Sequence, residues 1–224
     1  MKKFLIPVLL LLLGACTAAP GSSVTVNPPL TEAPTPAPTE EIDIAEEAFD
    51  PARDVVIYDG EDQDTFVFTR FPGNREEMQL LIDAYTLEDA ENTAAFYIAA
   101  LNIYPYDEEE ALAMIDLLRG PQPLSEEDKR FLKERLSDKM YLPRVYFEGA
   151  TPENDYTPED PWTLIIYEDP VEAPEGYEYV YVLTAGADSP RRIVTREKGD
   201  SEYLWDYVST LVQVRDPASV DPWK

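Results

Sequence analysis

The side chains of this sequence that could take part in chemistry are mainly carboxylates, aromatic rings and arginines. Its 224 residues include 45 Asp and Glu, no histidine and a single cysteine. These counts exclude Ser-His-Asp and Cys-His catalysis, disulfide frameworks and Cys/His zinc sites. No serine is followed by a lysine three residues later, and neither a GxSxG elbow nor a phosphate-binding loop occurs. The sequence therefore does not indicate an enzyme that uses an activated nucleophile.

Once these nucleophiles are excluded, pairs of carboxylates are the remaining groups that could act as general acid and base. A glycosidase needs two carboxyl groups about 5–9 Å apart, one of them with a raised pKa. Spacing along the sequence cannot select one pair among 45 acids, so we predict no catalytic residue. The acidic run 59–64 has Asp64 where an EF-hand loop has its glycine, and we interpret it as a solvated loop. We predict no metal site and no cofactor.

Aromatic residues are concentrated in the second half of the chain. Tyrosines alternate along 177–181, so a strand there would place three rings on one face. Exposed rings could stack on sugars or grip a peptide, whereas buried rings would form the contact of a sheet with its helices. Two Asp-Pro-Trp triplets occur, at 160–162 and 221–223. Their tryptophans could stack on a ligand, or the proline could form a stiff turn that packs the ring against the folded domain. The candidate ligand-binding rings are Tyr179, Tyr181, Trp162, Trp205 and Trp223.

Positive charge is scarce and gathers at one point in this half of the chain. Arg191, Arg192 and Arg196 lie within six residues of one another in a sequence of net charge −27. Such a group could receive a carboxylate or phosphate. The alternative is that these arginines form internal ion pairs with the many acids. We include Arg191 among the candidate ligand-binding residues.

The first residues have the features of an export signal. Lys2 and Lys3 precede an apolar run of ten residues, Phe4–Leu13, which is half the length of a membrane-spanning helix. The run ends in Leu13-Gly14-Ala15-Cys16, which resembles the lipobox of bacterial lipoproteins. The resemblance implies cleavage after residue 15 and attachment of lipid to Cys16. Two acyl chains on one residue suffice for stable anchoring, so we expect a chain held at the extracytoplasmic face of the cell membrane.

A spacer is expected between this anchor and the folded part. Residues 16–45 contain six prolines and few large apolar residues, so they cannot bury a core. The folded domain is expected to span 46–224. The segments 17–74, 75–139 and 140–224 carry net charges of −10, −9 and −10, so the acidity is spread evenly. An evenly acidic chain repels nucleic acid, and we expect no nucleic-acid partner.

The periodicity of the folded part predicts an α+β domain. About four short helices are expected in its N-terminal half, beginning after Asn74, with residues 86–89, after Asp107 and at Ser125. Aromatic and β-branched residues then predict an antiparallel sheet of four to five strands, with the helices packed on one face. The strand candidates are 145–147, 163–167, 177–184, 192–196 and 203–208.

Several short motifs together resemble an uncharacterised domain family of clostridial and related Gram-positive bacteria, often found in secreted or lipidated proteins. The motifs are GPQPLS at 120–125, YFEGATP at 146–152 with Asn154 and YTP at 156–158, DSPR at 188–191 and DPW at 221–223. The resemblance covers about residues 65–223. Because the family has no assigned activity, the resemblance implies a domain boundary and a host group but no catalytic residue.

These observations favour a lipid-anchored surface module that binds a cell-surface glycan, a peptide or another protein. A carboxylate-based hydrolase acting on surface polysaccharide is the first alternative, and a structural subunit of a membrane-associated assembly is the second. A cleft with two close acids would favour the hydrolase, and a shallow groove lined by Tyr179, Tyr181 or Trp205 would favour binding.

Overall fold

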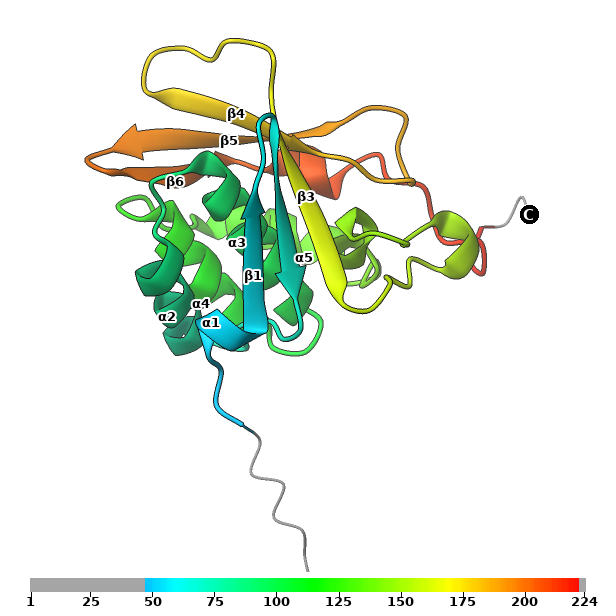
Figure 1. Cartoon of the computed structure of the whole chain (residues 1–224). Helices are drawn as coiled ribbons and strands as arrows, with labels where there is room; N and C mark the ends of the chain where they lie inside the picture. The colour runs from blue at the N-terminus through cyan, green and yellow to red at the C-terminus, as the bar shows by residue number, and fades with distance from the viewer. Residues whose placement is uncertain (1–46, 222–224) are drawn as a thin grey trace, which may run out of the picture. The chain divides into compact units, whose positions relative to one another are not determined.

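The most apolar segment of the folded part forms its central helix, α3 (Ala90–Ile103). All of its residues except Glu91 and Ile103 are buried, as expected of a helix that is apolar on nearly every side. In this computed structural model, which describes residues 47–221, a six-stranded antiparallel sheet curls around α3 (Figure 1). The described residues, 47–221, all belong to one compact unit of the chain. The predicted α+β class is confirmed.

The four predicted helices are present, and three begin at the predicted residues, whereas the one expected to open with 86–89 begins just after them, at Ala90. The side chains of Asn74, Asp107 and Ser125 each accept a hydrogen bond from a backbone N–H in the first turn of their helix. A one-turn helix is present in addition, before the first strand. Besides α3, the helices are α1 (Pro51–Asp54), α2 (Arg75–Tyr85), α4 (Glu108–Arg119) and α5 (Glu126–Leu136).

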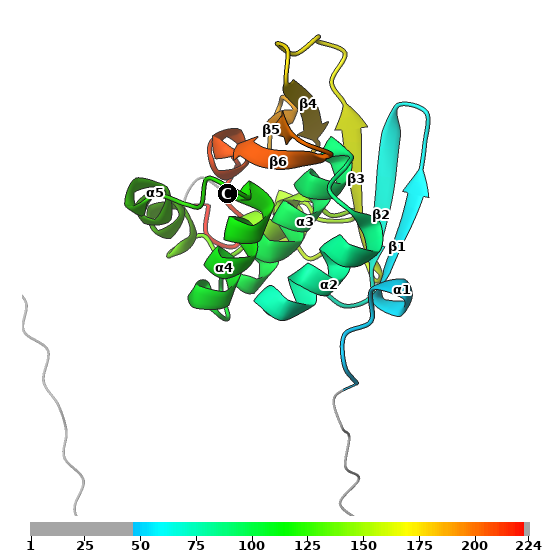
Figure 2. The ribbon, with the colours of Figure 1, turned by 90° about the vertical axis from the view of Figure 1, so that its left-hand side faces the viewer.

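The strands lie in the sheet in the order in which they occur in the chain. They are β1 (Val55–Asp59), β2 (Gln63–Phe68), β3 (Trp162–Glu168), β4 (Tyr177–Val182), β5 (Arg191–Lys198) and β6 (Ser201–Asp206). Pairing is shortest between β3 and β4, which share only the register pairs from Ile166↔Val182 to Glu168↔Val180. The sheet bends there, so that β1–β3 stand along one side of α3 and β4–β6 lie across its top (Figure 2).

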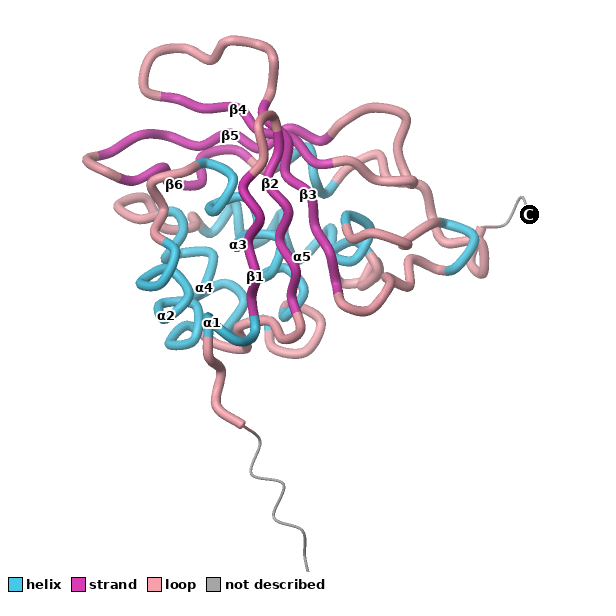
Figure 3. Tube along the Cα trace, viewed as in Figure 1, coloured by secondary structure: helices cyan, strands magenta, loops and turns pink. Residues whose placement is uncertain are grey.

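Two parts of the sheet differ from the expectation. The hairpin β1–β2 was not predicted, so the sheet has six strands and begins before the four predicted helices. The predicted strand at 145–147 is wrong, because residues Leu142–Tyr146 form a 3-10 helix, and Phe147 makes only an isolated bridge to Leu164. Pro143 favours this turn, and the segment 141–147 is buried on all sides except at Arg144, so it lacks the alternation of a half-exposed strand. This helix belongs to the mostly irregular stretch 137–161 (Figure 3).

The buried and exposed faces of β4–β6 are clearly separated. Val180, Val182, Ile193 and Leu204 are buried against the helices on the concave side of the sheet. The tyrosines at 177, 179 and 181 lie on the other, convex face and are half-buried. The structure thereby settles the question that strand alternation left open, namely which face is exposed to solvent.

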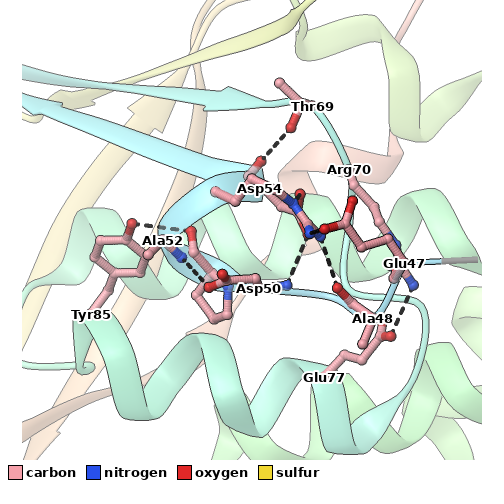
Figure 4. A network of polar contacts seen from close by, with 11 residues as sticks. Glu47, Ala48, Asp50, Ala52, Asp54, Thr69, Arg70, Glu77 and Tyr85 are labelled. Atoms are coloured by element: carbon pink, nitrogen blue, oxygen red, sulfur yellow. Dashed lines mark hydrogen bonds and ion pairs between the residues drawn. The ribbon is translucent and has the colours of Figure 1, made fainter.

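The N-terminal end of the described residues is held by a dense polar network (Figure 4). The buried carboxylate of Asp54 accepts hydrogen bonds from the backbone N–H of Asp50 at 2.9 Å and from the Arg53 guanidinium at 2.7 Å. The hydroxyl of Tyr85 donates to the carbonyl of Val55 at 2.8 Å and so joins α2 to the first strand. The network therefore ties α1 and β1 to the helical layer.

Candidate functional site

The convex face of the sheet carries a cluster of rings and arginines, which we name the tyrosine–arginine face. Its members are Tyr167, Tyr177, Tyr179, Tyr181, Arg192, Arg196 and Trp205. The Arg192 guanidinium lies 4.4 Å from the centre of the Tyr179 ring. The Arg196 guanidinium lies 4.8 Å from the Trp205 ring and 5.3 Å from the Tyr177 ring. Each guanidinium thus lies over aromatic rings within the distance of about 6 Å at which cation–π contacts form.

Two tyrosines form a stack at the bend of the sheet. Tyr167 on β3 and Tyr181 on β4 are register partners, and their rings are 5.1 Å apart and nearly parallel, at 7°. Direct cross-strand neighbours approach closely enough for such ring pairs to stabilise the sheet. The stack extends the tyrosine–arginine face across the bend.

The two arginines differ in their electrostatic partners. Arg192 forms an ion pair of 2.8 Å with Asp169, whose side chain is almost fully buried. Arg196 forms no ion pair with any carboxylate in residues 47–221 and contacts only rings. Arg196 therefore retains donors that a ligand could use.

A pocket of about 380 Å³ opens beside Arg196, between β6 and the end of α4, and we name it the Trp205 pocket. Residues that line it include Arg119, Gln122, Arg196, Lys198, Tyr203 and Trp205. Its three cations form no ion pairs within the described part of the chain. The Tyr203 ring at the edge of the pocket packs directly on Gly120, whose φ is +56° and where a Cβ would overlap this ring. Glu197 is the one carboxylate in the lining, so the three cations give the pocket a net positive charge in an otherwise acidic protein.

The structure separates the six predicted ligand-binding residues of the folded part. Tyr179, Tyr181 and Trp205 share the tyrosine–arginine face, and the two tyrosines lie on one face of β4, as their alternation predicted. Trp162 lies at the start of β3 in a different pocket. Trp223 lies outside the described residues, as does the predicted lipid attachment site, Cys16.

Arg191 is turned away from the tyrosine–arginine face. Its side chain is buried, with the residue only 6% exposed. The guanidinium donates to the backbone carbonyls of Ser189 at 3.3 Å and Gln213 at 2.7 Å. It thus ties the C-terminal segment to the start of β5. The exposed arginines of this strand are its neighbours Arg192 and Arg196, which alternation places on the opposite face.

A second pocket, of about 440 Å³, surrounds Trp162, and we name it the Trp162 pocket. The residues that line it include Phe68, Phe71, Tyr106, Met140, Arg144 and Trp162. The Trp162 ring meets Phe71 and Phe147 edge to face, each at 5.1 Å. Nothing in the sequence pattern indicated Tyr106 or Arg144, because the pocket is assembled from segments that are far apart in the chain.

Acidic side chains crowd the N-terminal turn of α3. Burial, and then the charges of Asp64, Glu178 and Glu168, raise the pKa of Glu91 from 4.5 to about 7. Burial also raises the pKa of Asp64 on β2. Among residues 47–221, no group of three or more carboxylates is arranged to hold a metal ion. Glu91 is therefore a carboxyl group that retains its proton close to neutral pH.

The fold and its surfaces define an α+β protein with an exposed aromatic and cationic sheet face. The chain belongs to a family described as a domain of unknown function (DUF6935), whose model matches residues 70–218. The predicted membership of a family without an assigned function is confirmed. No curated protein and no solved structure matches the chain. Within the described ranges, no helix has the length and hydropathy needed to cross a bilayer.

Proposed function

We propose that this protein is a lipoprotein of the cell surface whose folded domain binds a glycan of the cell wall through the tyrosine–arginine face. The observation that carries the binding proposal is the placement of Arg196 against the rings of Tyr177 and Trp205, with its charge unpaired among the described residues. Flat rings offer stacking surface to sugars, and a guanidinium donates hydrogen bonds to hydroxyl or carboxylate oxygens.

The location proposed for this activity rests on the sequence of the first residues. The basic start, the ten-residue apolar run, the lipobox-like Leu13–Cys16 and the lone cysteine support lipid attachment at Cys16. A proline-rich spacer, 16–45, would let the folded domain reach beyond the membrane surface. A Gram-positive host is part of the same proposal.

Retention on purified cell-wall polysaccharide tests the binding proposal. The chain from Glu46 onward should be retained on insoluble wall glycan, and Trp205→Ala should reduce retention at least about tenfold, because a stacked ring contributes on the order of 1.4 kcal/mol. Tyr58→Ala is the matched control, since Tyr58 is 61% exposed but lies on β1, away from the tyrosine–arginine face. Equal retention of both variants, or none of the parent chain, would contradict the proposal.

Labelling with a fatty acid tests the proposed anchor independently. The parent protein should acquire label in the membrane fraction of the host, whereas Cys16→Ser should not. Equal labelling of the two proteins would exclude lipid attachment at Cys16 and leave the binding proposal standing.

A carboxylate-based hydrolase is the second candidate, and the raised pKa of Glu91 is the observation that favours it. A carboxyl group that keeps its proton near neutral pH can act as a general acid. Release of reducing ends from wall polysaccharide, abolished by Glu91→Gln, would support this function. Absence of release by the parent protein would exclude it for that substrate.

A further inference from the structure

We propose that the Trp162 pocket binds a small molecule that carries one carboxylate on an apolar, ring-sized body. This ligand site is separate from the tyrosine–arginine face, and it would exist whether or not that face binds a glycan. Its volume of about 440 Å³ lies in the range of small-molecule pockets, and its walls are largely apolar.

The aromatic wall of the pocket is held rigidly. The Trp162 ring meets Phe71 at 79° and Phe147 at 65°, and Phe71 and Phe147 in turn meet each other at 72°. Edge-to-face contacts on two sides fix the orientation of the indole before any ligand arrives. A pre-formed apolar wall lowers the ordering cost of binding a ring.

Arg144 supplies the polar group of the site. Its Nε is buried without a hydrogen-bond partner, and its side chain forms no ion pair or ring contact with the described residues. Buried polar groups are nearly always satisfied, yet this Nε is not, and the half-buried guanidinium has no carboxylate beside it among the described residues. The guanidinium fork matches the two oxygens of a carboxylate. A carboxylate ligand would therefore supply the counter-charge that no described residue gives to Arg144.

Arg191 offers a comparison within the same protein. It too has a buried Nε without a partner, but its terminal nitrogens donate to Ser189 and Gln213. Arg191 thus performs a structural task that Arg144 does not. The difference between these two arginines is the reason for assigning a ligand to Arg144.

Two further residues fit the proposed ligand. Tyr106 lines the pocket and is 87% exposed, so most of this large ring is in contact with solvent. A ligand in the pocket would cover part of this exposed apolar surface. Asp160 also lines the pocket, is exposed, and forms no ion pair with Arg144 in the described part of the chain. Its negative charge disfavours a second carboxylate, so a monocarboxylate fits better than a diacid.

Saturation-transfer NMR with two matched probes tests the proposal on the chain from Glu46 onward, which contains the whole described core. Phenylacetate supplies a ring and a carboxylate, whereas 2-phenylethanol supplies the same ring without the charge. Phenylacetate should bind with a dissociation constant of about 1 mM or tighter, and 2-phenylethanol at least about tenfold more weakly. Equal binding of the two probes, or binding of neither, overturns the proposal.

Variants separate a binding role of Arg144 from a structural one. Arg144→Met should weaken phenylacetate binding at least about tenfold and leave 2-phenylethanol unchanged, with an equal or higher melting temperature. Arg191→Met should instead lower the melting temperature, because it removes hydrogen bonds to backbone carbonyls. A comparable loss of stability in Arg144→Met would overturn the proposal. Tyr106→Ala, at a residue the core does not need, should weaken binding of both probes, and unchanged binding would also count against the site.

Discussion

Arg192 stacks on Tyr179 although its direct register partner on β4 is Tyr181. The guanidinium reaches diagonally across the two strands while its Nε donates to Asp169 at 2.8 Å. Diagonal neighbours in an antiparallel pair remain within reach of long side chains. The ion pair and the ring contact together fix the direction of Arg192 and leave the Tyr181 ring free to stack on Tyr167.

This geometry predicts a measurable coupling between Arg192 and Tyr179. Arg192→Ala should lower the free energy of unfolding by about 1 kcal/mol, because it removes the ring contact and leaves the buried Asp169 carboxylate without its cation. A double-mutant cycle with Tyr179→Ala, followed by urea denaturation, should give a coupling energy of about 0.5–1 kcal/mol. Arg130→Ala is the control, since Arg130 pairs only with exposed carboxylates on α5. A coupling indistinguishable from zero would show that the contact contributes no stability.

The raised pKa of Glu91 predicts a specific pH dependence of stability. In the folded state this group keeps its proton up to pH about 7, whereas in the unfolded chain it loses the proton near pH 4.5. Its contribution is therefore fully present below pH 4.5 and is lost as the pH rises through about 7. Glu91→Gln should consequently raise the free energy of unfolding at pH 8 by about 2 kcal/mol, a value reduced to allow for partial exposure, and change it little at pH 4.

Denaturant titrations of the parent and variant at both pH values measure this difference directly. Glu88→Gln serves as the control, because Glu88 is exposed and lies one turn before Glu91. The hypothesis fails if Glu91→Gln has the same effect at pH 4 and pH 8.

Asp54 should show the opposite pH dependence. The hydrogen bond from Arg53, then that from the Asp50 backbone N–H, hold the pKa of Asp54 below its usual 3.8, with burial opposing them. Its stabilising contribution is therefore present above about pH 4 and is lost as the pH falls through the lowered value. Asp54→Asn should lower the free energy of unfolding at pH 7 by about 1–2 kcal/mol, with a smaller loss at pH 2. Thermal unfolding across this range tests it, and a loss independent of pH would refute the assignment.

Gly120 and Gly176 form a matched pair for testing how tightly Tyr203, a residue of the Trp205 pocket, packs on Gly120. Both have positive φ, at +56° and +77°, so alanine strains the backbone at either position. Only at Gly120 would the new Cβ also meet the Tyr203 ring, whereas Gly176 has nothing within 4 Å. Gly176→Ala should cost about 1 kcal/mol, and Gly120→Ala at least about 1 kcal/mol more, because overpacking adds to strain. Equal melting temperatures of the two variants would mean that Tyr203 moves aside freely.

The helices were the part of the fold that the sequence specified most completely. Local chemistry sets their starts, because the capping side chains of Asn74, Asp107 and Ser125 bond to backbone groups only three residues away. Composition likewise identified α3 as the buried helix, because a helix that is apolar on nearly every side has no polar face to expose to solvent. The strands β3–β6 followed from alternation and aromatic content for the same local reason.

Tertiary structure alone decided what these elements present to solvent. Alternation predicted that the tyrosines of β4 lie on one face, but it does not say whether that face is buried or exposed. Helix α3 packs against the concave side of the sheet, so the opposite face, which carries the tyrosines, is the exposed one. The same docking turned Arg191 inward and left Arg192 and Arg196 outside. The Trp162 pocket joins β2, α3, the turn at Arg144 and β3, and no local pattern records contacts between segments so far apart. Local hydrogen bonding and side-chain patterns thus determined where the helices and strands lie in the sequence. Packing against α3 determined which of their faces are exposed to solvent and available to a ligand.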